Sequence, residues 1–264
     1  MEKLIRKLEE ERLFHLIPPI KWLYSLENRE VEVYFEPTGK LQQRDMSVWP
    51  IRGMEMWPSW LRETVFGPGV DIEAAYNQFI VGMLLEHAPT PTFVSLVYPD
   101  LIAQFNDKQA WRENLCRDIG FEVNETNIKV IKTLVMALAN GSNISGKIMN
   151  AFSSFSQARD LLEVPLENAT LEERERVGER LGRIAKQFRD ARKVVGSYLG
   201  NGGKREMSKR VFPAYFSWER EKRYEIWEKI GRYGLMTHDG IDGIPPEVLA
   251  KKWQELQELD IKVA

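Results

Sequence analysis

The chain has 264 residues, of which 43% are hydrophobic, 29% charged and 11% aromatic. This composition is typical of a soluble globular protein with a sizeable core and excludes a disordered chain. The 37 lysines and arginines nearly balance the 39 aspartates and glutamates, so the formal net charge is -2. On that figure alone the chain is not a histone-like, strongly basic nucleic-acid binder.

The N-terminus and the cysteine count indicate where the protein works. Residues 1–16 interleave charged residues with Leu and Ile at helical spacing, which predicts a short amphipathic helix that ends before Pro18-Pro19. A signal peptide would need a continuous apolar run, and a membrane-spanning helix about 20 apolar residues; neither is present in the sequence. Cys116 is the single cysteine, which excludes an internal disulfide, and three histidines are too few to complete a Cys/His zinc cluster with it. We therefore expect a cytoplasmic protein with no membrane partner.

Local patterns predict further elements in chain order. Val31, Val33 and Phe35 alternate with charged residues before Thr38-Gly39, which indicates a strand and a hairpin turn. The segment from Trp49 to Gly69 is rich in Pro, Gly and Trp and is expected to be an irregular covering segment.

Three helices follow from periodicity and capping signals. Residues 128–139 carry an apolar stripe of helical period, and Asn140-Gly141 is a typical helix-ending pair. Thr170 and Glu173 form a capping box that starts a long helix, which is expected to run to the breaker cluster at 200–203. Its apolar seam, which can pack within the domain or pair in a coiled coil, is Val177, Leu181, Ile184, Phe188, Ala191 and Val195. A further helix is predicted from Glu247 to Leu259.

The long helix and the segment after it are basic. Nine basic residues there face only Asp190 and Glu206, a net charge of +7. The nine are Arg183, Lys186, Arg189, Arg192, Lys193, Lys204, Arg205, Lys209 and Arg210. Such a segment is either a solvated helix face or a surface that binds phosphates. Neighbouring rings, among them Tyr215 and Phe216, either stack on bases or belong to the core.

Three segments carry residues suited to chemistry. Asp71 follows Gly67-Pro68-Gly69-Val70 and precedes a mostly apolar run, as if at the end of a short strand with a helix beyond it. A carboxylate there either holds a divalent metal or caps the next helix. His238-Asp239 precedes Gly240, which offers a second strand-end carboxylate or a purely structural turn. Lys132 heads a helix face that it shares with residues four and eight positions later, and it either contacts a triphosphate or faces solvent.

Taken in chain order, the segments of Asp71, Lys132 and His238-Asp239 resemble motifs A, B and C of palm-domain polynucleotide polymerases. The resemblance is to the family A superfamily, which includes the single-subunit phage-type RNA polymerases, and within it to the compact, divergent polymerases of viruses and mobile elements. Motif B there reads Lys, three residues, an aromatic, three residues, Tyr-Gly, where this chain has Lys132, Met136, Asn140 and Gly141. Motif C begins His-Asp and matches His238-Asp239.

Other positions extend the resemblance. Lys129 lies near the position where the family has an arginine ahead of the motif B lysine. Tyr76 lies five residues after Asp71, which is similar to the ring that excludes ribonucleotides in family B polymerases and reverse transcriptases. The segment from Tyr98 to Trp111 also looks like the compact polymerases.

The resemblance implies a helix-rich α+β fold, with a polymerase palm formed by a small antiparallel sheet and with helical fingers. Residues 1–66 would form an N-terminal lobe, either a reduced thumb or a partner-binding part. Residues 67–106 would be palm with motif A, 107–203 fingers with motif B and the long basic helix, and 204–264 palm with motif C and the C-terminal helix.

It also implies roles for the residues. Asp71, Asp239 and the backbone carbonyl of Ile72 would bind two Mg²⁺ ions, with Mn²⁺ as an alternative. Lys132 would contact the triphosphate and protonate pyrophosphate, and His238 would position the primer end. The nucleotide contacts would be Tyr76, Lys129, Lys132, Met136 and Asn140, and the nine basic residues would bind DNA.

We therefore expect a DNA polymerase without proofreading that adds dNTPs to a DNA primer-template, with a replication helicase or primase as a partner. One alternative is a primase or DNA-dependent RNA polymerase of the same superfamily. The other is a non-catalytic nucleic-acid-binding protein with a dimerising helix.

Overall fold

The structure is a computed structural model in which most of the chain is described. The described residues are 1–26, 34–38, 44–49, 54, 57–139, 169–200, 204–237, 240–259 and 262–263. For four of these stretches only the backbone is described: 34–38, 44–49, 59 and 204–209.

The chain divides into two compact units. Unit 1 consists of Met1–Glu73 and Phe216–Ala264, and unit 2 is Ala74–Tyr215. The chain crosses between them after Glu73 and again within one helix, α13 (Lys204–Lys229). The four-segment division expected from the sequence places its boundaries elsewhere and stays a prediction.

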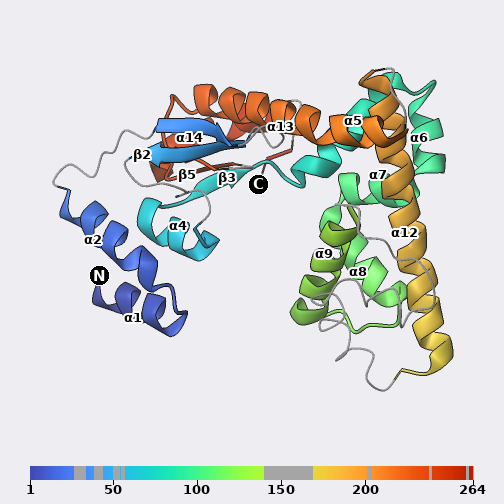
Figure 1. The fold of residues 1–264 in the computed structure, drawn as a ribbon, viewed down its shortest axis with the longest axis horizontal. Helices are drawn as coiled ribbons and strands as arrows, with labels where there is room; N and C mark the ends of the chain where they lie inside the picture. Colours follow the sequence, from blue (N-terminus) through green and yellow to red (C-terminus); the bar gives the residue numbers. More distant parts are fainter. Residues whose placement is uncertain are drawn as a thin grey trace. The chain divides into compact units, whose positions relative to one another are not determined.

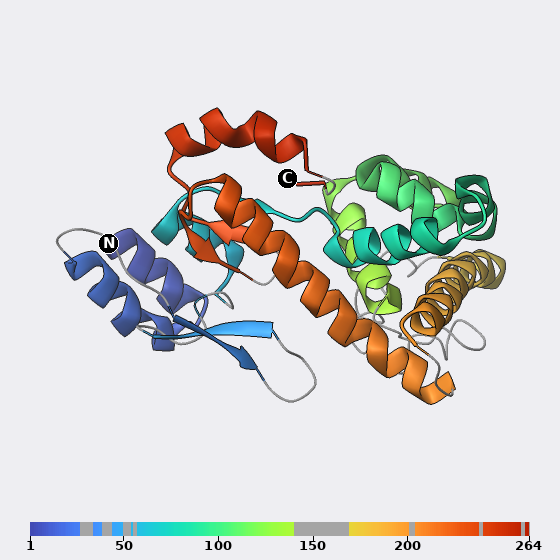
Figure 2. The same ribbon diagram turned by 90° about the horizontal axis from the view of Figure 1, so that it is seen from above.

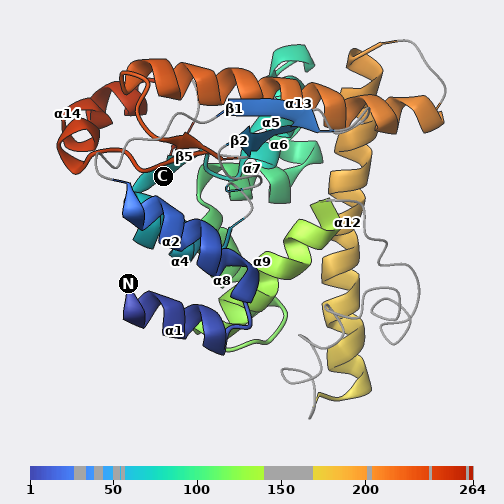
Figure 3. The same ribbon diagram turned by 60° about the vertical axis from the view of Figure 1, so that its left-hand side comes forward.

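Unit 1 combines short helices with strands. Its elements besides the second half of α13 are α1 (Glu2–Glu10), η1 (Phe14–Leu16), α2 (Ile17–Ser25), β1 (Tyr34–Thr38), β2 (Arg44–Trp49), α4 (Ser59–Phe66), β3 (Gly69–Asp71), β4 (Leu235–Met236), β5 (Gly240–Asp242) and α14 (Pro246–Gln257). Its core cluster joins α1, α2, α4 and β4 through Leu4, Leu8, Leu16, Ile20, Met54, Trp57, Leu61 and Leu235. The first two helices lie side by side (Figure 3).

The N-terminal part of unit 1 corrects two expectations. The helix expected over residues 1–16 is shorter, because α1 ends at Glu10 and only the 3-10 turn η1 follows before residue 17. Pro18 and Pro19 stand in the first turn of the next helix, α2, where a missing N–H costs nothing. The expected irregular segment from Trp49 to Gly69 contains the helix α4. The predicted hairpin is confirmed: β1 pairs antiparallel with β2 (Figure 2), while Val31 and Val33 lie outside the described residues.

A three-stranded antiparallel sheet of order β3-β5-β4 lies in unit 1. Its strands β3 and β5 are labelled in Figure 1. Val70 of β3 faces Ile241 of β5, and both side chains are buried. Pairing continues beyond β5, since the Ile244 N–H donates to the Pro68 carbonyl at 2.9 Å. The helix-rich α+β class is thereby confirmed, with this small antiparallel sheet as its β part.

Unit 2 is helical. Its elements besides the first half of α13 are α5 (Ala75–His87), α6 (Pro91–Val97), α7 (Pro99–Asn106), α8 (Lys108–Asp118), α9 (Glu125–Ala139) and α12 (Leu171–Tyr198). The capping box of Thr170 and Glu173 is confirmed by both of its hydrogen bonds. All six residues of the predicted seam of α12 are buried, and α12 packs on α5, α7 and α9 within the unit.

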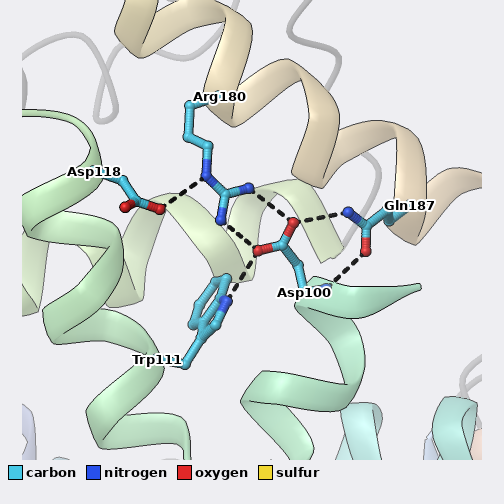
Figure 4. Close-up of polar contacts among 5 residues, drawn as sticks. All are labelled: Asp100, Trp111, Asp118, Arg180 and Gln187. Atoms are coloured by element: carbon cyan, nitrogen blue, oxygen red, sulfur yellow. Dashed lines mark hydrogen bonds and ion pairs between the residues drawn. The ribbon is translucent and has the colours of Figure 1, made fainter. Parts of the chain in front are cut away.

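A buried polar network joins three helices of unit 2 (Figure 4). Asp100 at the start of α7 receives two hydrogen bonds from Arg180 of α12, at 2.6 and 2.8 Å. Trp111 of α8 donates to the same carboxylate at 3.1 Å, and Gln187 of α12 donates to it at 2.7 Å. Arg180 also reaches Asp118 at 3.2 Å. Burial by itself would raise the pKa of Asp100, but these donors outweigh it and lower the pKa below the ordinary aspartate value.

No helix within the described part of the chain is long and apolar enough to cross a membrane.

Candidate functional site

Asp71 occupies the last position of β3, as the sequence predicted. The strand is short because Ala74, with φ 49° and ψ 46°, turns the chain into α5. This left-handed conformation costs a non-glycine residue roughly 1–2 kcal/mol. Asp71 is exposed, whereas its neighbours Val70 and Ile72 are buried, so β3 is anchored by its apolar residues and presents the carboxylate at the surface.

The His238-Asp239 pair lies between β4 and β5, which form a hairpin. Leu235 pairs with Asp242 and Met236 with Ile241, and the Thr237 N–H donates to the Gly240 carbonyl at 2.8 Å. The two residues between Thr237 and Gly240 are outside the described residues, so their catalytic roles stay predictions.

Asp71 and Gly240 are paired residues on neighbouring strands. A Cβ atom added to Gly240 would overlap Oδ1 of Asp71 and the Val70 carbonyl oxygen, and would come within 2.9 Å of the Asp71 Cα. The Asp71 carboxylate therefore lies directly over Gly240. Because Gly240 is covalently joined to Asp239, β3 and β5 bring the first and third sequence segments to one edge of the sheet.

Ile72 lies next to the C-terminal end of the chain. It forms an isolated antiparallel bridge with Val263, and the Glu73 N–H donates to the Lys262 carbonyl at 2.8 Å. That bond does not use the Ile72 carbonyl, which was predicted as a metal ligand, and the ligand role stays a prediction.

Three residues next to the predicted site were missed in the sequence. Asp242 follows Asp239 by three positions and ends β5, where its carboxylate accepts from Arg62 of α4 at 2.5 Å. Arg223 of α13 donates to the Thr237 carbonyl, directly before His238-Asp239. The sequence carries no signal for these partners of Arg62 and Arg223, because the partners are brought near them only by strand pairing.

Tyr76 belongs to unit 2 and packs into an aromatic cluster. Its ring stacks on Phe212 at a centroid distance of 5.7 Å and meets Tyr215 edge-on at 5.2 Å. Burial raises the pKa of Tyr76 to about 12, and the nearby Arg192 guanidinium partly opposes that rise. The ring is held by packing, and its predicted role in sugar selection stays a prediction.

The motif B residues that are described lie on the exposed side of α9. Lys129 pairs with Glu125 at 2.8 Å, Lys132 is exposed, and Met136 is 55% exposed. Asn140 lies outside the described residues. The predicted helix is confirmed, and it begins slightly earlier than predicted, at Glu125.

The basic side chains of α12 lie opposite its buried seam. Those that are exposed are Arg183, Lys186, Arg189 and Lys193, and we call them the α12 basic face. Asp190 contacts Lys193 at 3.2 Å. Arg192 and Arg210 are half-buried, while the side chains of Lys204, Arg205 and Lys209 are outside the described residues.

Among the described residues, which do not include His238 and Asp239, no three His, Cys, Asp or Glu side chains come together as a metal site. The predicted two-carboxylate site is therefore neither assembled nor excluded by the described side chains. Comparison with protein-family models, with curated proteins and with solved structures finds no match for this chain.

Proposed function

We propose that this chain is a template-directed nucleotidyltransferase, a compact DNA polymerase of palm type without proofreading. The observation that supports it most is the antiparallel pairing of β3 with β5, in which the Asp71 carboxylate lies over Gly240, the residue after His238-Asp239. Two carboxylates at the ends of neighbouring strands are the kind of ligand set that divalent metals need for phosphoryl transfer.

The residues at this edge fit Mg²⁺, because Asp71 offers an exposed, hard oxygen ligand. In the proposed site Asp71 and Asp239 would hold the ions, with Ile72 supplying a backbone carbonyl. Bound Mg²⁺ lowers the pKa of a coordinated hydroxyl and neutralises charge on phosphate oxygens. His238 would hold the primer 3'-hydroxyl in line with the α-phosphorus of the dNTP.

The resemblance to the polymerases implies the nucleotide and DNA contacts. Lys132 is exposed at the head of its helix face and would contact the triphosphate as a point charge. The ring of Tyr76 would press against the 2' position of the sugar and exclude ribonucleotides. The α12 basic face is suited to backbone phosphates, because four exposed cations on one helix face release counterions when they meet DNA.

Primer extension with Mg²⁺ tests the proposal, with dNTPs and NTPs compared on primed and unprimed DNA and RNA templates. We expect Asp71→Asn and Asp239→Asn to lower the extension rate on the order of 10³-fold, since loss of a metal ligand removes about 4 kcal/mol of transition-state stabilisation. Asp118→Asn is the matched control, because it makes the same charge change at an exposed site in unit 2. Full extension by Asp71→Asn would contradict the proposal, and NTP incorporation on an unprimed template would favour the primase alternative.

A second candidate function is non-catalytic nucleic-acid binding, which the α12 basic face favours. It predicts DNA binding without Mg²⁺ dependence that is unchanged in Asp71→Asn. Replacing Arg183, Lys186 and Arg189 by Gln is expected to reduce the slope of log K against log salt by about 3 in either case. The salt dependence of DNA binding therefore does not separate the two candidate functions, whereas primer extension does.

A further inference from the structure

Two arginines of unit 1 are buried beside the hairpin that carries His238-Asp239. Arg62 is 8% exposed and Arg223 is 3% exposed. Arginines are rarely buried unless their charge is compensated, because removing a guanidinium from water costs several kcal/mol. Both direct their donors at residues of the hairpin, one on each side of the loop.

Arg62 holds the outgoing strand. Its Nε donates to Oδ2 of Asp242 at 2.5 Å, and its Nη1 donates to the Trp57 carbonyl at 2.7 Å. The guanidinium therefore ties the last residue of β5 to the residues that precede α4. Asp242 is also the residue that pairs with Gly69 of β3, so the same contact fixes the register of the strand that carries Asp71.

Arg223 holds the incoming strand. Its Nη1 donates to the carbonyl of Thr237, a residue that is 0% exposed. The N–H of Thr237 donates to the Gly240 carbonyl at 2.8 Å. Both backbone polar groups of Thr237 therefore have fixed partners immediately before His238.

We propose that Arg62 and Arg223 are positioning residues for the β4–β5 hairpin, acting through Asp242 and the Thr237 carbonyl on the strand residues that flank His238-Asp239 in the sequence. The consequence for catalysis rests on the proposed function. Clamping both strands fixes Thr237 and Gly240, the described residues between which His238-Asp239 lies in the sequence. Arg62 also forms an ion pair with the carboxylate of Asp242, which lies on the same face of the sheet as Asp71.

The directed geometry of a guanidinium explains why arginine stands at position 62. Arg62 makes two bonds in different directions from one planar group, which a lysine ammonium cannot reproduce from the same stem. Arg→Lys variants retain the charge and much of the buried volume, and Arg→Met variants remove the charge. Comparing the two separates directed hydrogen bonding from charge alone.

Amide hydrogen exchange of the full chain tests the positioning without any assay of activity. In Arg223→Met and Arg62→Met we expect the peptide that covers 235–242 to exchange about tenfold faster, with residues 177–195 of α12 unchanged. The exchange rate of this peptide in Arg62→Lys is expected to be closer to the rate in Arg62→Met than to the wild-type rate. Arg232→Met is the matched control, since Arg232 is exposed and pairs with Glu228. Wild-type protection of 235–242, or a uniform loss of protection over both units, would overturn the proposal.

Primer extension then tests the consequence for catalysis. We expect kcat to fall about 10–100-fold in both Met variants while KM for the dNTP stays within about twofold, as is typical when a supporting residue of a metal site is removed. Faster exchange with an unchanged kcat would overturn the catalytic consequence. If the wild-type chain does not extend primers, the proposed function fails, and the exchange experiment still decides whether the two arginines position the loop.

Discussion

Gly240→Ala is the substitution for which the structure makes the sharpest prediction. The added Cβ would overlap Oδ1 of Asp71 and the Val70 carbonyl, and it would lie 2.9 Å from the Asp71 Cα. Two of these three atoms are backbone, so rotation of one side chain cannot relieve the overlap, and β3 must move away from β5. Overpacking of this kind costs about 1–3 kcal/mol.

Urea unfolding measures that cost. At about 2 kcal/mol, and with a slope of about 2 kcal/mol per molar urea, the midpoint of Gly240→Ala is expected to fall by about 1 M. Gly82→Ala is the control: Gly82 lies on α5 with no atom within 4 Å of its added Cβ, and alanine there is expected to stabilise by about 0.5–1 kcal/mol. An unchanged midpoint for Gly240→Ala would refute the close approach of the two strands. Primer extension in the same variant is expected to fall as well, because the Asp71 carboxylate must shift.

Three further predictions concern stability. Removing one partner of the buried Asp100–Arg180 pair by Asp100→Asn is expected to cost about 3–5 kcal/mol at neutral pH. Because the folded pKa of Asp100 lies below the unfolded value of 3.8, its stabilisation is present above 3.8 and is lost as pH falls through the folded pKa. In acid, the urea midpoint of Asp100→Asn should therefore depend less on pH than the wild-type midpoint. Ala74→Val is expected to cost about 1–2 kcal/mol, because a β-branched residue resists the left-handed conformation, whereas Ala74→Gly should change stability by less than about 0.5 kcal/mol, since relief of strain and added unfolded-state entropy offset each other. With its pKa raised to about 12, Tyr76 stabilises the fold fully below pH 10.0 and loses that contribution as pH rises through about 12, so Tyr76→Phe should lose less stability over that interval. Ultraviolet titration of tyrosinate checks the pKa itself, and a titration in which every tyrosine ionises with a midpoint near pH 10.0 would contradict it.

Features of the fold that depend on local spacing could be predicted from the sequence. The capping box at Thr170, the buried seam of α12 and the strand that ends at Asp71 are each set by residues a few positions apart. Helical and strand periodicity repeat over a few residues, so the local sequence pattern was sufficient to predict these elements.

Features that depend on long-range pairing could not be predicted. Arg62 and Asp242 are far apart in the chain, and nothing near either residue indicates the other. The 26-residue helix α13 was also missed, because Pro213 in its interior and the glycines before it are local signals against a helix. Tertiary packing outweighs those signals here.

Burial distinguishes the roles of the aspartates in a way that their sequence contexts do not. Asp100 is buried and held by Arg180, Trp111 and Gln187, and Asp242 is held by Arg62, so both carboxylates stabilise the fold. Asp71 is exposed at a strand end, where removing a charge costs less than about 1 kcal/mol. Substitution by Asn should therefore cost stability at Asp100 and, on the proposed function, activity at Asp71. If Asp71→Asn loses as much stability as Asp100→Asn and loses activity only to the same extent, Asp71 stabilises the fold as Asp100 does and is not a metal ligand.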